Sequence, residues 1–135
     1  MIEFKNIQKK FGKQHVLHGI DLKFDQSGIF AILGPNGSGK TTLIKSLMGM
    51  VHPTGGQILI DGQIKKGNEY RNNIAYLPQI ARFPENLSVN EFLDFIENIR
   101  GKATRKAELM TAFGANEFAD KKLRALSGGM RQKVN

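Results

Sequence analysis

The feature that most constrains the fold is the stretch Gly34-Pro35-Asn36-Gly37-Ser38-Gly39-Lys40-Thr41-Thr42. It matches G-x-x-x-x-G-K-[ST], the phosphate-binding P-loop, a pattern that belongs between a β-strand and an α-helix. The sequence offers both, because the short apolar run 29–33 precedes the stretch and apolar residues at helical spacing follow it. The stretch therefore predicts a nucleotide site, and its setting disfavours the alternative of a glycine-rich turn with a solvated lysine.

Each part of this stretch has an expected task. The glycines let the backbone curl so that successive N–H groups face one concavity, where the helix N-terminus adds its positive dipole end. Lys40 is expected to reach the β- and γ-phosphates, the Thr41 hydroxyl to complete the shell of a Mg²⁺ ion, and Thr42 to meet the α-phosphate.

Length and composition favour one ordinary globular domain, with 135 residues, 40% apolar and 24% charged. No apolar run approaches the roughly 18–20 residues needed to span a bilayer, and residues 1–5 do not resemble a signal peptide. The absence of cysteine excludes disulfides and thiolate metal sites and is compatible with a cytoplasmic protein. His15, His18 and His52 follow no metal-binding spacing, so we expect them to be surface or turn residues.

The net charge of +8 raises the question of a nucleic-acid partner. The basic residues are spread from Lys5 to Lys133, with no aromatic platform between them and no arginine-rich arm. Solvated basic faces are the better explanation, and no nucleic-acid partner is expected.

The pattern along the chain changes from strands to helices near residue 80. Strands are predicted at 2–4, 20–24, 29–33, 58–60 and 74–77, and a helix from 43 to about 49–51. Ser88 and Glu91 form a capping box that should begin a helix continuing to Ile99. Shorter helices are expected at 104–113, at 116–120 and after residue 129. The predicted organisation is a nucleotide-binding core over 1–79 and a helical subdomain over 80–135.

A second stretch with candidate binding groups is Leu126-Ser127-Gly128-Gly129-Met130-Arg131-Gln132. A serine followed by two glycines at a helix start offers a hydroxyl, bare backbone N–H groups and a dipole end, which together could form another anion site. Taken alone, the stretch is better explained as an ordinary N-cap.

Together the two stretches resemble the nucleotide-binding domain of ATP-binding cassette (ABC) proteins, and the resemblance covers the whole chain. Residues 126–132 are similar to the family signature, with Met130 where glutamine is commonest. Phe11 and Val16 resemble the family's adenine-stacking aromatic and its apolar neighbour, and Gln79 occupies the position of the Q-loop glutamine. From spacing alone, Phe11 is as well explained as a core or surface aromatic, and Gln79 as a loop amide.

The resemblance implies a P-loop NTPase fold of the α/β class: a parallel sheet with helices, N-terminal antiparallel strands, and a helical subdomain. It implies ATP and Mg²⁺ as cofactors, with Thr41 and Gln79 near the metal. It also implies a head-to-tail dimer, in which the P-loop of one subunit and Ser127, Gly128 and Gly129 of the other enclose one ATP. A transmembrane permease would be the further partner, placing the protein in the cytoplasm at the inner face of the cell membrane.

The family's Walker B aspartate, general-base glutamate and switch histidine have no counterpart in this sequence. We therefore expect the chain to be a truncated part of a longer ATPase, unable by itself to hydrolyse ATP at a useful rate. In the family the Walker B strand pairs with the strand expected at 29–33. Without it, that strand would have an open edge, and we expect the edge to pair with another chain by swapping, dimerisation or aggregation. Two alternatives remain open: a soluble ABC protein of the translation-factor kind, supported only by the charge, and a non-catalytic nucleotide-binding fragment.

Overall fold

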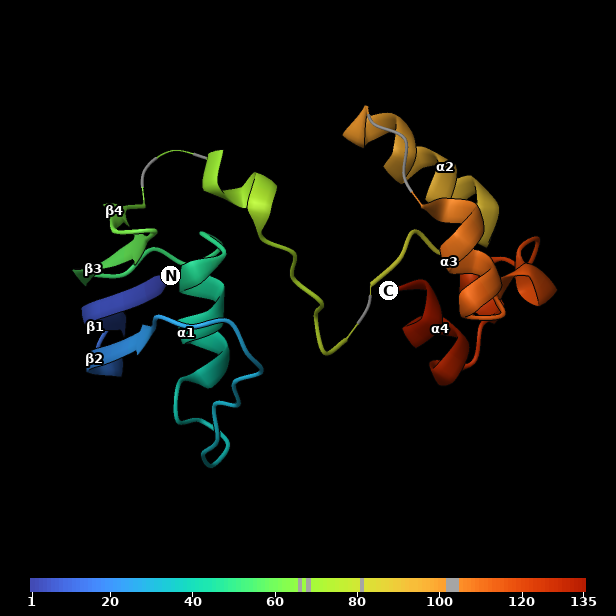
Figure 1. Ribbon diagram of the computed structural model, residues 1–135. Helices are drawn as coiled ribbons and strands as arrows, with labels where there is room; N and C mark the ends of the chain where they lie inside the picture. Colours follow the sequence, from blue (N-terminus) through green and yellow to red (C-terminus); the bar gives the residue numbers. More distant parts are fainter. Residues whose placement is uncertain (66, 68, 81, 102–104) are drawn as a thin grey trace. The chain divides into compact units, whose positions relative to one another are not determined.

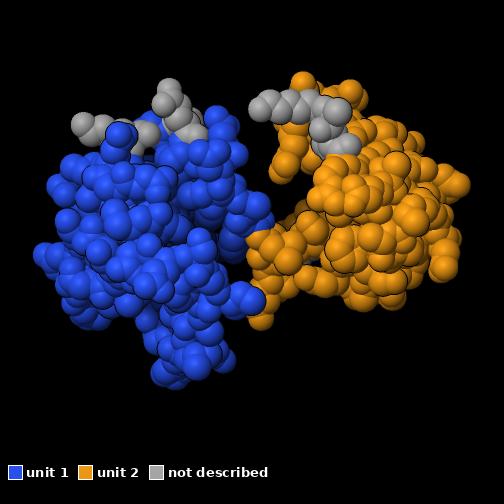
Figure 2. All heavy atoms as spheres, in the orientation of Figure 1, with its two compact units in different colours: residues 1–76 blue, residues 77–135 orange. Residues whose placement is uncertain are grey.

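The computed structural model describes residues 1–65, 67, 69–80, 82–101 and 105–135. It divides into two compact units, Met1–Tyr76 and Leu77–Asn135, which are coloured separately in Figure 2. The functional boundary after residue 79 stays a prediction.

Unit 1 contains a four-stranded sheet in which every pair of neighbours is antiparallel (Figure 1). Its strands, in the spatial order β2-β1-β3-β4, are β1 (Ile2–Phe11), β2 (Gln14–Phe24), β3 (Gly55–Ile60) and β4 (Gln63–Ile64). The strands predicted at 2–4, 20–24 and 58–60 are confirmed, and all three are longer than predicted. The sequence underestimated their length because alternation of apolar and polar residues marks only the part of a strand that covers a core.

The pairing of β1 with β2 is interrupted by a β-bulge at Val16. Lys9 pairs with Leu17 and Lys10 pairs with His15, so Val16 has no residue opposite it. Such an extra residue bends the strand and changes which side chains share a face.

The helix α1 (Lys40–Leu47) lies against the sheet, and its Leu43 completes the core of unit 1. The buried residues of this core are Phe4, Ile7, Leu17, Leu43 and Ile58. The helix ends earlier than predicted, at Leu47, because Gly49 adopts a left-handed conformation with φ of 70°.

The strands expected at 29–33 and 74–77 are not formed, and this part of the prediction is wrong. Ile29 is fully exposed and Leu33 is 89% exposed, although a strand of a parallel sheet should be buried on both faces. A strand exists only beside a partner that takes its backbone hydrogen bonds. Among the described residues, every paired strand belongs to the antiparallel sheet, so these two segments have no ladder to join. The 3-10 helix η1 (Glu69–Asn73) leads into the second segment.

Unit 2 is helical, as predicted. It contains α2 (Val89–Arg100), α3 (Lys106–Ala112), the 3-10 helices η2 (Ala115–Phe118) and η3 (Leu123–Ala125), and α4 (Gly128–Val134). Its core is built from Val89, Met110, Ala115, Phe118, Leu123 and Leu126. The predicted helix start at residue 104 lies outside the described residues. No helix in the described part of the chain is long and apolar enough to cross a bilayer.

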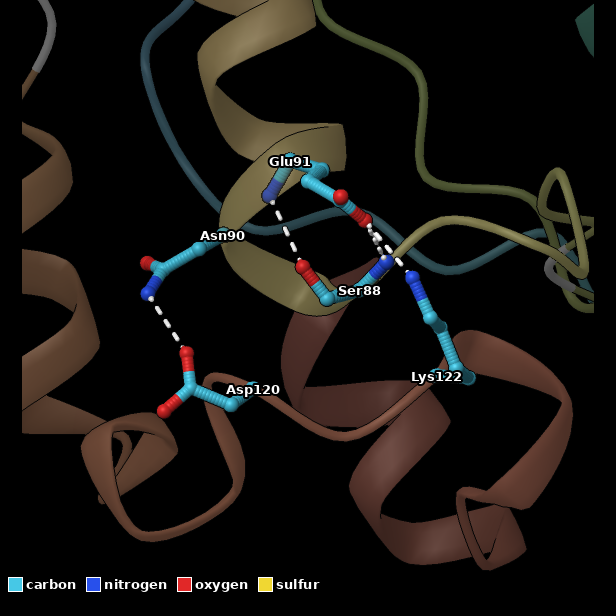
Figure 3. A network of polar contacts seen from close by, with 5 residues as sticks. All are labelled: Ser88, Asn90, Glu91, Asp120 and Lys122. Atoms are coloured by element: carbon cyan, nitrogen blue, oxygen red, sulfur yellow. Dashed lines mark hydrogen bonds and ion pairs between the residues drawn. The ribbon is translucent and has the colours of Figure 1, made fainter.

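The capping box that begins α2 is confirmed and is extended by contacts from farther along the chain (Figure 3). The backbone N–H of Ser88 donates to Glu91 Oε2 at 2.6 Å, and the Glu91 N–H donates to Ser88 Oγ at 3.2 Å. Lys122 Nζ adds a hydrogen bond of 3.1 Å to the same Oε2. The first turn of α2 is thereby fastened to the segment that precedes the 126–132 stretch.

Candidate nucleotide-binding site

The P-loop of unit 1 closes around the side chain of its own lysine. Lys40 is the first residue of α1, and its Nζ donates hydrogen bonds of 2.7 Å to the carbonyl oxygens of Gly34 and Pro35. A backbone bond of 3.3 Å from Ser38 N–H to Pro35 O closes the turn. Phosphate oxygens would bind the ammonium more strongly than these neutral carbonyls, because such bonds are charge-assisted on both sides. The arrangement therefore suits an anionic ligand.

The N-terminus of α1 reinforces this preference for negative charge. The first turn contains no acidic side chain that would offset the positive end of the helix dipole. Asn36, Gly37 and Ser38 are exposed and lie directly before it. Backbone N–H groups at such a position can bind phosphate without any further charged residue.

Gly39 is the point at which the loop touches the sheet. Its φ is 90°, a left-handed conformation that favours glycine. A Cβ placed there would lie 2.7 Å from Leu17 Cδ2 and 3.0 Å from the carbonyl oxygen of Val16. Glycine is thus required at this position by both backbone conformation and space, and the β-bulge brings the strand close to the loop.

Two residues, Phe11 and Val16, are expected to contact adenine, and the structure places Val16 next to the P-loop. Val16 is half-buried, packs against the core of unit 1 and approaches Gly39. Phe11 ends β1 with 49% of its surface exposed, and Lys9 Nζ lies 4.7 Å from the centre of its ring. Phe11 is therefore available for stacking, and its role in binding adenine stays a prediction.

The residues expected near the metal contribute few ligands by themselves. Thr41 is exposed at the first turn of α1, and Thr42 is half-buried with its carbonyl oxygen accepting from Ser46 Oγ at 2.8 Å. The described residues hold no group of three or more His, Asp or Glu side chains that could bind a metal ion. A Mg²⁺ ion here would combine the Thr41 hydroxyl with phosphate and water oxygens, which is the usual pattern for Mg²⁺ bound with a nucleotide.

Gln79 and the 126–132 stretch belong to unit 2. Gln79 is an exposed residue between Pro78 and α2. Ser127 caps α4 by accepting a hydrogen bond of 3.3 Å from the Met130 N–H, so the helix begins at Gly128 rather than after Gly129. The Cβ positions of Gly128 and Gly129 have nothing within 4 Å, which leaves this surface open. The roles of these residues toward ATP and Mg²⁺ remain predictions.

Two basic residues that the sequence did not single out hold the other end of α1. Lys65 Nζ donates to Ser46 O at 2.7 Å, and Arg71 Nη2 donates to Gly49 O at 3.2 Å. Cations at a helix C-terminus are favourable because they offset the negative end of its dipole. No local pattern identifies these residues, because they follow the helix by many positions and reach it only in the folded unit.

Comparisons with known proteins identify the family to which this chain is related. The profile of the ABC transporter family matches residues 17–135. The chain is 32% identical over 139 residues to the uncharacterized ABC transporter ATP-binding protein YxlF of Bacillus subtilis, covering 99% of this chain and 46% of the relative. It is also 32% identical over 138 residues to the zinc import ATP-binding protein ZnuC of Rickettsia bellii, covering 99% of this chain and 54% of that protein.

A solved structure of an ATP-binding subunit of an ABC transporter superposes with a TM-score of 0.82 at 28% identity, over 99% of this chain and 59% of that chain. This likeness supports the α/β class, although the two parallel strands are not formed here. The chain spans about half the length of the curated relatives described above. Because the family profile matches well over half of its residues, the chain belongs to the ABC transporter family.

Proposed function

We propose that this chain forms the nucleotide-binding part of an ATPase subunit that drives an ABC transporter. The observation that carries the proposal is the pair of hydrogen bonds from Lys40 Nζ to the loop carbonyls of Gly34 and Pro35. They hold the ammonium inside the loop, where the β- and γ-phosphates of ATP would replace the two carbonyl oxygens. Relatives named as import ATP-binding proteins support the link to transport.

In this proposal, each predicted site residue has its own task. Gly34, Gly37 and Gly39 shape the cradle, Lys40 and Thr42 meet phosphates, Thr41 holds Mg²⁺ when the ion is bound, and Phe11 and Val16 receive the adenine. Gln79 would contact the Mg²⁺ ion or the attacking water. Ser127, Gly128 and Gly129 would act on the ATP held by a second subunit, so that ATP binding closes a head-to-tail dimer.

A transmembrane permease is the proposed further partner, with the ATPase in the cytoplasm at the inner face of the cell membrane. We also propose that the 135-residue chain by itself binds ATP but does not hydrolyse it. The family's Walker B aspartate and general-base glutamate have no counterpart in its sequence. Asp61, which follows the apolar end of β3, accepts a hydrogen bond of 2.7 Å from the N-terminal ammonium instead.

The proposal is tested by measuring ATP affinity with a fluorescent nucleotide, in Mg²⁺, for the unmodified chain and for Lys40→Ala. The variant should lose affinity at least about tenfold, because charge-assisted bonds contribute roughly 1.5–3 kcal/mol each. Lys45→Ala is the matched control, since it removes a lysine from the last turn of the same helix. Equal affinity of Lys40→Ala and the unmodified chain would reject the site.

A further inference from the structure

The bulge in β2 brings two histidines together on one face of unit 1. His15 and His18 are three residues apart, and in a regular strand such residues point to opposite faces. The extra residue Val16 restores them to the same side, so that their ring centres lie 4.0 Å apart with 41° between the ring planes. His18 is exposed as expected, and His15 is half-buried beside it.

One ring nitrogen of His15 has no partner within the protein. Nε2 is buried and has no hydrogen-bond partner within the described part of the chain. An imidazole nitrogen that no protein group uses can bind a metal ion.

We propose that His15 and His18 form a binding site for a late first-row transition-metal dication such as Zn²⁺, with water completing the coordination. Imidazole nitrogen suits Zn²⁺, Ni²⁺ and Cu²⁺, whereas Mg²⁺ prefers oxygen ligands, so this site is chemically distinct from the one at Thr41. His18 is exposed on β2, so water can reach its ring and complete the coordination of a bound ion.

Neighbouring charge sets how tightly such an ion can bind. On β1, Gln8 lies opposite His18 and Lys10 lies opposite His15. The positive charge of Lys10 repels a metal cation bound at the histidines. Among the described residues, no Asp or Glu lies close enough to form a three-residue metal-binding group with them. The site is consequently a weak one, and removing the charge of Lys10 should strengthen it.

The test is isothermal titration of the untagged 135-residue chain with ZnCl₂ at pH 7.5, compared with His15→Gln and His18→Gln. We expect one Zn²⁺ per chain in the unmodified protein and a loss of affinity of at least about tenfold in each variant. His52→Gln is the matched control and should bind as the unmodified chain does. Lys10→Gln should bind more tightly, and MgCl₂ should give no signal at this site.

The proposal is overturned if the unmodified chain binds no Zn²⁺, or if affinity is unchanged in His18→Gln, or if it falls only in His52→Gln. Circular dichroism of each variant shows whether the fold is retained. His18 is exposed, so His18→Gln keeps the test decisive even if His15→Gln fails to fold. Shifts of the His15 and His18 ring resonances on adding Zn²⁺ provide an independent reading of the same contact.

Discussion

The carbonyl oxygen of Val16 lies 3.0 Å from the point where Gly39 would carry a Cβ, so the bulged strand and the P-loop are in direct contact. Gly39→Ala should destabilise unit 1 by about 1–3 kcal/mol, because it adds a left-handed alanine and a clash with Val16 O and Leu17. Chemical denaturation without nucleotide measures this difference.

Gly37→Ala is the matched control for that substitution. Gly37 has a similar φ of 84°, but a Cβ there meets nothing within 4 Å. Gly37→Ala should therefore be destabilised only by the cost of placing alanine in a left-handed conformation, without the added cost of a clash. Equal losses in the two variants would mean that the contact with Val16 contributes nothing.

Lys65→Met should destabilise unit 1 by about 0.3–1 kcal/mol, because it removes a cation from the C-terminal end of α1. Methionine retains much of the side chain's length without its charge. Lys23→Met, at an exposed position of β2, should change the stability by less. The effect of Lys65→Met should shrink in high salt, and a loss that salt leaves unchanged would argue against the dipole explanation.

Ser88→Ala should lower the stability of unit 2 by about 1 kcal/mol, since it deletes the N-cap oxygen that accepts from the Glu91 N–H. The helical circular dichroism signal during thermal unfolding measures the change. Ser127→Ala removes the equivalent oxygen from the shorter helix α4 and provides a comparison. A Ser88→Ala chain that unfolds like the unmodified one would contradict the capping role.

Glu91 should make unit 2 sensitive to acid. Hydrogen bonds from the Ser88 backbone, Lys122 and the Ser88 side chain lower the pKa of Glu91 below its ordinary value of 4.5. Because the pKa of Glu91 is lower in the folded state than in the unfolded state, ionised Glu91 stabilises the fold at pH values above its unfolded-state pKa. This stability is lost as the pH falls below about 4.5. Glu91→Gln should therefore show a smaller loss between pH 6 and 3 than the unmodified chain in thermal unfolding. Parallel curves for the two proteins would contradict this.

His15 should add a second pH dependence, at higher pH and in unit 1. Because its pKa is lowered from 6.5, the folded state resists protonation, so stability is fully present above pH 6.5 and falls as the pH drops below it. His15→Gln should flatten the stability curve between pH 8 and 5. Lys10→Gln should flatten it partly, because one of the charges that disfavour protonation is removed. An unchanged slope in His15→Gln would contradict the assignment.

Features with a local cause could be predicted from the sequence. Ser88 and Glu91 begin α2 as expected because both partners of the capping box lie within one helical turn. Lys40 begins α1 because the loop glycines and the following apolar residues are neighbours in the chain. The 29–33 run was misjudged for the opposite reason. Its apolar character is local, but a strand also needs a pairing partner from elsewhere.

By itself, the sequence determined the P-loop, the capped helices, the serine-glycine start of α4 and membership of the ABC transporter family. Only the tertiary structure decided that residues 29–33 stay unpaired, that Lys65 reaches the end of α1, and that Val16 bulges against Gly39. The same bulge places His15 beside His18. Strand register and bulges arise from hydrogen bonds between distant residues, and no short stretch of sequence carries that information.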